Sequence, residues 1–156
     1  MNKKKNLATK ETFILAVQNH KKSNFEIAEK LYKEILNIDP DHFESIFLLG
    51  SLSIQTGNFN LAKQLLSKAI QIQPENAKAH NNLGLAFKEL GELDESVDRY
   101  QHAIKIMPNF VEAYNNLGLT FEELGRFNES INSYQQAIKI NPEYAEAYNN
   151  LGLTLK

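Results

Sequence analysis

Three pairs of adjacent asparagines form the most regular set of hydrogen-bonding side chains in the chain. The six residues, spaced by 34 positions from pair to pair, are Asn81, Asn82, Asn115, Asn116, Asn149 and Asn150. Each carboxamide offers two N–H donors and an acceptor oxygen, so a row of them could bind the backbone of an extended peptide whatever its sequence. Asparagine is also unfavourable inside a helix on propensity alone, which favours a functional explanation. The alternative is that duplication copied the pairs without any role of their own.

Groups that could support catalysis or bind a metal show no such order. The four histidines pair with no recurring carboxylate; they are His20, His42, His80 and His102. We expect His80 to be a packing residue. Glu122 and Glu123 could act as acid and base, but no nucleophile accompanies them and nothing desolvates them, so we expect a solvated helix face. The chain has no cysteine, which excludes a thiolate nucleophile and a cysteine metal site. The sequence therefore predicts no enzyme, no metal site and no cofactor.

Composition limits the class of protein and of partner. Of 156 residues, 42% are hydrophobic and 23% charged, and the net charge is −2, as in soluble folded proteins. No basic stripe is present, which disfavours nucleic acid as a partner. The apolar run Phe13–Val17 is too short for a membrane span or a secretion signal. These features, with the lack of cysteine, predict a cytoplasmic protein without a membrane partner.

A single period of 34 residues governs the glycines and prolines. The repeating positions are Pro40, Pro74, Pro108 and Pro142, then Gly50, Gly84, Gly118 and Gly152, then Gly57, Gly91 and Gly125. Glycine and proline are the strongest punctuators of backbone conformation, so their common period indicates one structural unit copied in series. We predict a flexible basic N-terminus at residues 1–8 and a repeat domain at 9–156. The repeats are 9–42, 43–76, 77–110, 111–144 and a partial copy at 145–156.

Each repeat is predicted to be a helix hairpin. Apolar residues follow one another at steps of three and four, as at Leu83 and Phe87, which places them on one helix face. The glycine at repeat position 8 lies in the middle of the first helix and costs about 1 kcal/mol relative to alanine, so we expect the paired helix to approach closely there. The glycine at position 15 suits a left-handed cap. Ala16 and Ser23 replace both glycines in the first repeat, whose hairpin should be less regular. Proline at position 32 ends the second helix.

The recurring residues resemble the tetratricopeptide repeat. The pattern is Asn-Leu-Gly, an aromatic residue, Gly, a small residue, Tyr, Ala and Pro at these offsets, and it covers residues 9–156. Serine replaces the usual alanine at position 20, at Ser96 and Ser130, where a buried hydroxyl could bond its own helix. The resemblance implies an all-α fold, a right-handed superhelical solenoid of antiparallel helix hairpins. It also implies a protein–protein interaction scaffold that binds a protein or peptide segment in its concave groove.

The resemblance places repeat positions 2, 5, 6, 9, 12 and 13 of the first helices in that groove. The predicted partner-binding residues are Lys78, Asn81, Asn82, Leu85, Glu112, Asn115, Asn116, Leu119, Glu146, Asn149, Asn150 and Leu153. The leucines could line the groove or merely pad neighbouring helices. In the first two repeats the same positions are apolar, at Phe13, Ile14, Phe47 and Leu48. These residues should either form an apolar pocket or be covered by the first ten residues of the chain, and we expect them to be covered.

Relatives that grip a C-terminal carboxylate use Lys and Asn, then Asn, then Lys and Arg in successive repeats. Lys78, Asn82 and Asn116 match the first part, but Glu146 and Asn150 stand in place of the last. Because the acidic residues would repel a carboxylate, we predict no such clamp and a neutral or basic peptide as partner. Replacing Asn82, Asn116 and Asn150 by alanine should then weaken partner capture and leave thermal stability nearly unchanged.

Two alternatives stay open beside the free-standing adaptor. The repeats resemble those that precede the catalytic part of protein O-linked N-acetylglucosamine transferases, so the chain could be the N-terminal substrate-recognition module of a glycosyltransferase or other transferase. The last helix keeps Tyr148, Gly152 and Leu155, which should receive a second helix. Either the natural chain continues beyond Lys156, or this face supports self-association.

Overall fold

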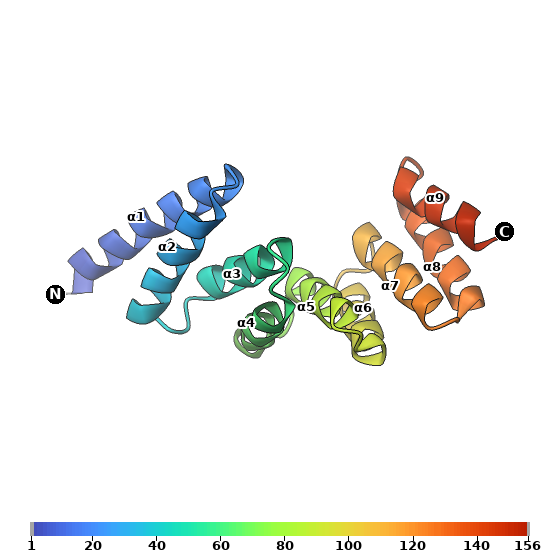
Figure 1. Ribbon diagram of the computed structural model, residues 1–156, viewed down its shortest axis with the longest axis horizontal. Helices are drawn as coiled ribbons and strands as arrows, with labels where there is room; N and C mark the ends of the chain where they lie inside the picture. Colours follow the sequence, from blue (N-terminus) through green and yellow to red (C-terminus); the bar gives the residue numbers. More distant parts are fainter. Residues whose placement is uncertain (1, 156) are drawn as a thin grey trace. The chain divides into compact units, whose positions relative to one another are not determined.

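Helices are the regular elements of the residues described. The computed structural model describes the backbone of residues 2–155 and the side chains of residues 7–155 (Figure 1). The helices are α1 (Asn2–Lys21), α2 (Phe25–Ile38), α3 (Phe43–Gln55), α4 (Phe59–Ile72), α5 (Ala77–Glu89), α6 (Leu93–Ile106), α7 (Val111–Glu123), α8 (Phe127–Ile140) and α9 (Ala145–Thr154). The predicted all-α class is confirmed. None of the helices described is both long and apolar enough to span a bilayer.

The chain forms two compact units, Met1–Pro74 (unit 1) and Glu75–Lys156 (unit 2). In unit 1, α1 packs against α2, α2 against α3 and α3 against α4. In unit 2 the same sequence of contacts runs from α5 to α9, and the first helices α5, α7 and α9 also contact one another in order. Figure 1 shows α7, α8 and α9 side by side. The first helix of each later repeat begins at the predicted repeat boundary, and each proline lies just after a second helix.

The first helix starts earlier than the sequence analysis expected. Residues 2–8, predicted to be flexible, are the beginning of α1. No glycine or proline interrupts the chain before Ser23, so the backbone has no local reason to leave the helical conformation. The division between residues 1–8 and a repeat domain at 9–156 stays a prediction.

The turn inside each hairpin follows the predicted left-handed cap. Gly57, Gly91 and Gly125 have φ between 72° and 77°. The next residue donates its N–H to a carbonyl five positions back, as in Glu92 N to Phe87 O at 2.9 Å, which is the Schellman arrangement. Ser23 adopts φ 60°, and Asn24 N donates to Asn19 O at 2.9 Å. The expectation that the first hairpin is less regular is therefore wrong at this turn. Ser23 adopts the backbone conformation that glycine has in the other turns, although this conformation is strained for a residue with a Cβ.

The glycines at repeat position 8 lie where the second helix comes closest, as predicted. A Cβ built on Gly118 would be 2.5 Å from Tyr134 Cε1, and one on Gly84 would be 2.9 Å from Tyr100 Cε1. Both tyrosines are fully buried. The cost of a helical glycine is thus offset by close packing of a large ring. At Gly152 a Cβ would meet nothing within 4 Å.

Ser96 at position 20 bonds the neighbouring helix and not its own, which corrects the sequence-based expectation for this serine, whereas Ser130 Oγ is buried with no hydrogen-bond partner among the residues described. Ser96 Oγ donates to the carbonyl of Gly84 over 2.8 Å. The carbonyl is accessible because the glycine lets α6 approach α5 so closely. The predicted helix faces are otherwise confirmed: Ala103 is fully buried and Lys105 on the same helix is exposed.

Candidate functional site

The first helices of unit 2 are joined by a ladder of asparagine side chains. Asn116 on α7 donates from Nδ2 to Oδ1 of Asn81 on α5 over 3.2 Å. One repeat later, Asn150 on α9 donates in the same way to Asn115 on α7 over 3.0 Å. The two acceptors are buried, with only 8% and 1% of Asn81 and Asn115 exposed. In the first two pairs, the first asparagine thus accepts from the second asparagine of the next pair.

This arrangement corrects part of the predicted site. Asn81 and Asn115 do not point into an open groove, because their side chains lie inside the contact between successive first helices. Asn115 Nδ2 also donates to Glu146 Oε1 over 3.1 Å, so both ends of this buried amide are satisfied. A buried amide without partners would be costly, which explains why the ladder is complete at this position.

The other predicted residues lie closer to the surface. Lys78, Glu112, Glu146, Asn149 and Leu153 are exposed, and Asn82, Leu85, Asn116, Leu119 and Asn150 are half-buried. Leu119 packs against the cluster of Tyr134, Ala137 and Ala147, so it pads neighbouring helices. Leu153, at the same repeat position, is 68% exposed.

Charged side chains near the ends of the first helices form ion pairs that we did not predict from the sequence. Lys88 Nζ lies 3.1 Å from a carboxylate oxygen of Glu89 and 3.2 Å from one of Glu123. Burial by itself would lower the pKa of Lys88, but the hydrogen bonds to both carboxylates outweigh it and the pKa is raised. The Lys88–Glu123 pair joins α5 to α7.

From the sequence we expected Glu122 to lie on a solvated helix face, but its carboxylate is bonded to two neighbouring helices. Its Oε2 accepts a hydrogen bond from the Tyr134 hydroxyl over 3.0 Å, and its Oε1 accepts one from Thr154. The carboxylate therefore links α7 to α8 and α9. Burial, with the negative charge of Glu122 nearby, raises the pKa of Tyr134.

In unit 1 a histidine takes the place of these charged groups. His20 near the end of α1 lies with Nε2 3.2 Å from Gln55 Oε1 on α3 and Nδ1 3.3 Å from the Tyr32 hydroxyl on α2. In the tautomer protonated on Nε2, the imidazole donates to Gln55 and accepts from Tyr32. His20 thus connects all three helices. Burial raises the pKa of Tyr32 to about 12.

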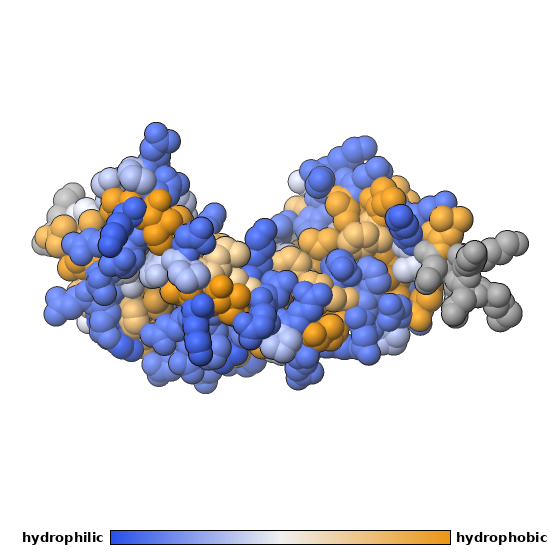
Figure 2. Space-filling model, turned by 180° about the vertical axis from the view of Figure 1, so that it is seen from behind, coloured by the Kyte–Doolittle hydropathy of each residue, from blue (hydrophilic) through white to orange (hydrophobic). Residues whose placement is uncertain are grey.

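A pocket of about 320 Å³ opens beside His20. Val17, Phe25, Tyr32 and Leu48 supply its apolar walls. From the sequence we expected the first ten residues to cover the apolar residues of this face, which are Phe13, Ile14, Phe47 and Leu48. That expectation is wrong, because residues 2–10 continue α1 as one helix and leave Ile14 49% exposed. Figure 2 shows hydrophobic residues at the surface on the side of the molecule next to the grey N-terminus.

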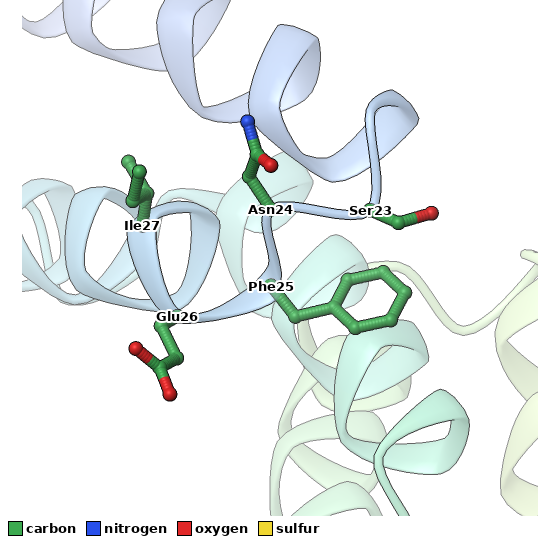
Figure 3. Close-up of a pocket in the computed structure, with 5 residues that line it drawn as sticks. All are labelled: Ser23, Asn24, Phe25, Glu26 and Ile27. Atoms are coloured by element: carbon green, nitrogen blue, oxygen red, sulfur yellow. The ribbon is translucent and has the colours of Figure 1, made fainter.

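A second depression, of about 410 Å³, surrounds the turn between α1 and α2. Figure 3 shows its five side chains. Ser23 and Phe25 point to one side of the turn, Asn24 and Ile27 point to another, and Glu26 points away from both. Because these groups do not converge, the depression does not form a site for one ligand.

Comparison with family models decides the family. The model described as TPR repeat matches residues 50–91, 84–125 and 123–156, which together make up more than half of the chain. The chain belongs to the tetratricopeptide repeat (TPR) family. No curated protein matches it significantly.

Solved TPR structures share this fold. A structure of the MamA protein is 29% identical with a TM-score of 0.86, over 94% of this chain and 80% of that one. YrrB, described as a TPR protein with an unusual peptide-binding site, is 21% identical with a TM-score of 0.78, over 92% and 74%. PilF of Pseudomonas aeruginosa is 20% identical with a TM-score of 0.85, over 97% and 69%. The predicted class, a solenoid of TPR hairpins, is confirmed.

Four of the contacts between successive TPR first helices share one offset. The pairs Asn81–Asn116, Asn115–Asn150, Lys88–Glu123 and His20–Gln55 all join residues 35 positions apart. The repeat length is 34, so position n of one repeat meets position n+1 of the next. Searching the sequence for complementary side chains at this offset would have found the pairs that the analysis by repeat position missed.

The remaining titratable groups show no catalytic or metal-binding arrangement in the part of the chain described. His80 is buried and stacks on His102, with ring centroids 5.5 Å apart, in keeping with its predicted packing role. No cluster of three or more His, Asp or Glu side chains able to hold a metal occurs among residues 7–155.

Proposed function

We propose that this TPR chain is a protein-interaction scaffold that binds a segment of a partner protein along the exposed faces of its first helices. The observation that carries the proposal is the orientation of Asn116 and Asn150. Each uses one N–H in the ladder and is half-buried, which holds the side chain in one orientation and leaves its amide oxygen and second N–H for a partner. A preoriented donor and acceptor bind a peptide backbone with little loss of side-chain entropy.

The charge of this surface favours a neutral or basic segment in unit 2. Glu112 and Glu146 are exposed, and Glu146 already accepts hydrogen bonds from Asn115 and from the Tyr144 hydroxyl. A partner's C-terminal carboxylate would be repelled there. We therefore expect no carboxylate clamp, in spite of the matching Lys78, Asn82 and Asn116.

The ladder changes how the asparagines can be tested. Alanine at position 116 or 150 removes the donor to a buried acceptor, so we now expect a loss of stability as well as of binding. Exposed Glu112 avoids this difficulty. Glu112→Lys on α7 reverses one charge on the proposed surface, and Glu95→Lys makes the same change at an exposed position of the second helix α6.

The experiment uses the full chain, immobilised, to select binders from a library of short random peptides. Selected basic peptides should bind Glu112→Lys about two- to fivefold more weakly, because one surface charge contributes up to about 1 kcal/mol. They should bind Glu95→Lys as they bind the unaltered chain. Equal loss for both variants, or loss for neither, would reject the assignment of the first-helix face. No enriched peptide would reject the scaffold itself.

The proposal includes three further expectations, about catalysis, the class of partner and the compartment. The chain binds without catalysing a reaction, its partner is a protein and not a nucleic acid, and it works in the cytoplasm, as the lack of cysteine and of a basic stripe suggests. The comparisons favour the scaffold over a recognition module of a transferase. Cell fractionation, and a binding assay with single- and double-stranded nucleic acid, test the compartment and the partner class.

Self-association through α9 is a second candidate, supported by one observation. Tyr148, Leu153 and Leu155 are each about half or more exposed, and a depression of about 420 Å³ lies over Gly152. A sedimentation mass that rises with concentration, and no longer does so in Leu155→Glu, would support a dimer of this chain. A constant mass of 17.8 kDa would reject it.

A further inference from the structure

We infer that the pocket in unit 1 is an anchor site for one bulky apolar side chain of the partner segment, flanked in that segment by an acidic residue. This inference rests on the proposed scaffold function and specifies the partner that unit 1 selects. The pocket has about 320 Å³ of space, which is enough for a leucine or phenylalanine side chain.

The position of the pocket ties it to the partner-binding face. Five of its lining residues come from the first helices α1 and α3, at repeat positions 6, 9, 12 and 13. These residues are Leu48, Val17, His20, Lys21 and Gln55. On the first helices of unit 2, positions 6, 12 and 13 carry amides and charged side chains, and position 9 carries leucines; all four positions belong to the proposed partner-binding face. A peptide that follows the first helices of unit 1 would therefore pass over the mouth of the pocket.

The walls of the pocket fit an apolar group. Tyr32 and Leu48 belong to, or pack against, the core cluster of unit 1, so the pocket floor is continuous with the hydrophobic core. Both ring nitrogens of His20, the Tyr32 hydroxyl and Gln55 Oε1 bond one another. A guest that displaces water from beside these atoms does not have to replace their hydrogen bonds, which favours an apolar group over a polar one.

The edge of the pocket adds a charge preference. Lys21 is the one charged residue in the lining, no carboxylate lines the pocket, and Lys21 is exposed. Within residues 7–155 it takes part in no salt bridge found in the structure. An acidic residue beside the apolar anchor would pair with it, at a strength that falls with added salt.

Strain at the turn supports a binding role for this region. Ser23 has φ 60° and lines the pocket, whereas the three equivalent turns use glycine. The left-handed conformation is strained for a residue with a side chain, and such strained residues concentrate at functional sites.

The test uses peptides selected on the full chain from a random library, followed by fluorescence anisotropy with synthetic copies. Leu48→Asn places in unit 1 the residue that repeats three and four carry at position 6, so the helix is known to accept it. Peptides with an apolar anchor should bind this variant about ten- to one hundred-fold more weakly, because burial of one such side chain is lost. The matched control is Ile27→Asn, which removes an exposed isoleucine outside the pocket and should leave affinity unchanged.

Lys21→Glu tests the charge preference, and because Lys21 is exposed, this substitution leaves the hydrophobic core unchanged. Position 13 holds glutamate in Glu89 and Glu123, so the fold accepts it. Binding should weaken about three- to tenfold at low salt, and the remaining affinity should lose its salt dependence. If Leu48→Asn is unfolded at the assay temperature, this variant alone decides.

The outcomes separate this inference from the scaffold proposal. Enriched peptides that lack a common apolar residue, or that bind Leu48→Asn and Lys21→Glu as well as the unaltered chain, would overturn the anchor site. If those peptides still respond to Glu112→Lys, the scaffold function stands. A common apolar residue with acidic neighbours, together with the loss in both variants, would establish the anchor site.

Discussion

In unit 1 the side of α1 and α3 that faces outward presents exposed Ile14, and half-buried Val17 and Leu48 line a pocket with Lys21 at its edge. In unit 2 the corresponding side of the first helices presents carboxamides and carboxylates. Both faces rest on the same hairpin, with the same left-handed turn and the same helix lengths within α3, α5 and α7. The backbone therefore does not determine what each face can bind. A few positions per repeat are enough to change a surface with an apolar pocket and a lysine into a surface of carboxamides and carboxylates.

The largest expected effect concerns the approach of the two helices in a hairpin. Unit 1 has a buried alanine, Ala16, where unit 2 has Gly118. Gly118→Ala should lower the free energy of unfolding by about 1–3 kcal/mol through overpacking against Tyr134, although alanine favours a helix. Urea unfolding followed by circular dichroism measures it. Gly152→Ala, with open space over the Cβ, should instead raise stability by about 0.5–1 kcal/mol; similar gains in both would show that the Tyr134 ring moves aside at no cost.

The asparagine ladder should be a stability element of unit 2 alone. Asn115→Ala removes the acceptor of Asn150 and the donor to Glu146, and should cost about 1–2 kcal/mol. Asn149→Ala, at the same repeat position but exposed, should change stability by less than about 0.5 kcal/mol. Thermal unfolding of the two variants gives the comparison. If their melting temperatures were equal, the ladder would contribute nothing to stability.

Alkaline pH should destabilise unit 2 more than unit 1. Burial raises the pKa of Tyr32 in unit 1 to about 12, and burial likewise raises the pKa of Tyr100 and Tyr134 in unit 2. The raised values contribute stability that is complete below the unfolded pKa of about 10 and is lost as the pH rises toward the folded values. Each such tyrosine should remove about 1.4 kcal/mol per pH unit in that window. Urea unfolding at increasing alkaline pH should show a shallower decline for Tyr100→Phe than for the unaltered chain, and an unchanged slope would refute the assignment.

The smallest effect distinguishes the turns. Ser23→Gly should raise the free energy of unfolding by roughly 0.5 kcal/mol, since relief of about 1–2 kcal/mol of backbone strain is partly offset by the greater entropy loss of glycine. Gly91→Ser in unit 2 should lower it by a similar amount. Both are measured by urea unfolding. A stabilising Gly91→Ser would mean that the two turns differ in more than the residue they carry.

The sequence was sufficient for most features that depend on one repeat considered alone, although it missed the regular turn at Ser23 and the early start of α1. Helix boundaries, left-handed turns and the close approach at Gly84 and Gly118 follow from the conformational limits of glycine and proline and from apolar spacing. The features that it missed depend on two neighbouring elements at once. The acceptor of Ser96 lies on the paired helix, and the roles of Asn115 and Glu122 depend on how successive first helices are offset. The pocket beside His20 likewise needs three helices to exist, so no pattern within one helix predicts it.

The one-residue offset between successive first helices has a consequence for how such a chain can grow. Because the two asparagines are adjacent, a repeat of unit 2 that has neighbours on both sides carries the acceptor for the repeat that follows and the donor for the repeat that precedes. Duplication or deletion of one whole repeat of this type joins an acceptor to a donor at the new junction without any further mutation. The number of such repeats can therefore change in a single genetic step with the amide contacts between them preserved, whereas a point mutation in one asparagine affects only one junction.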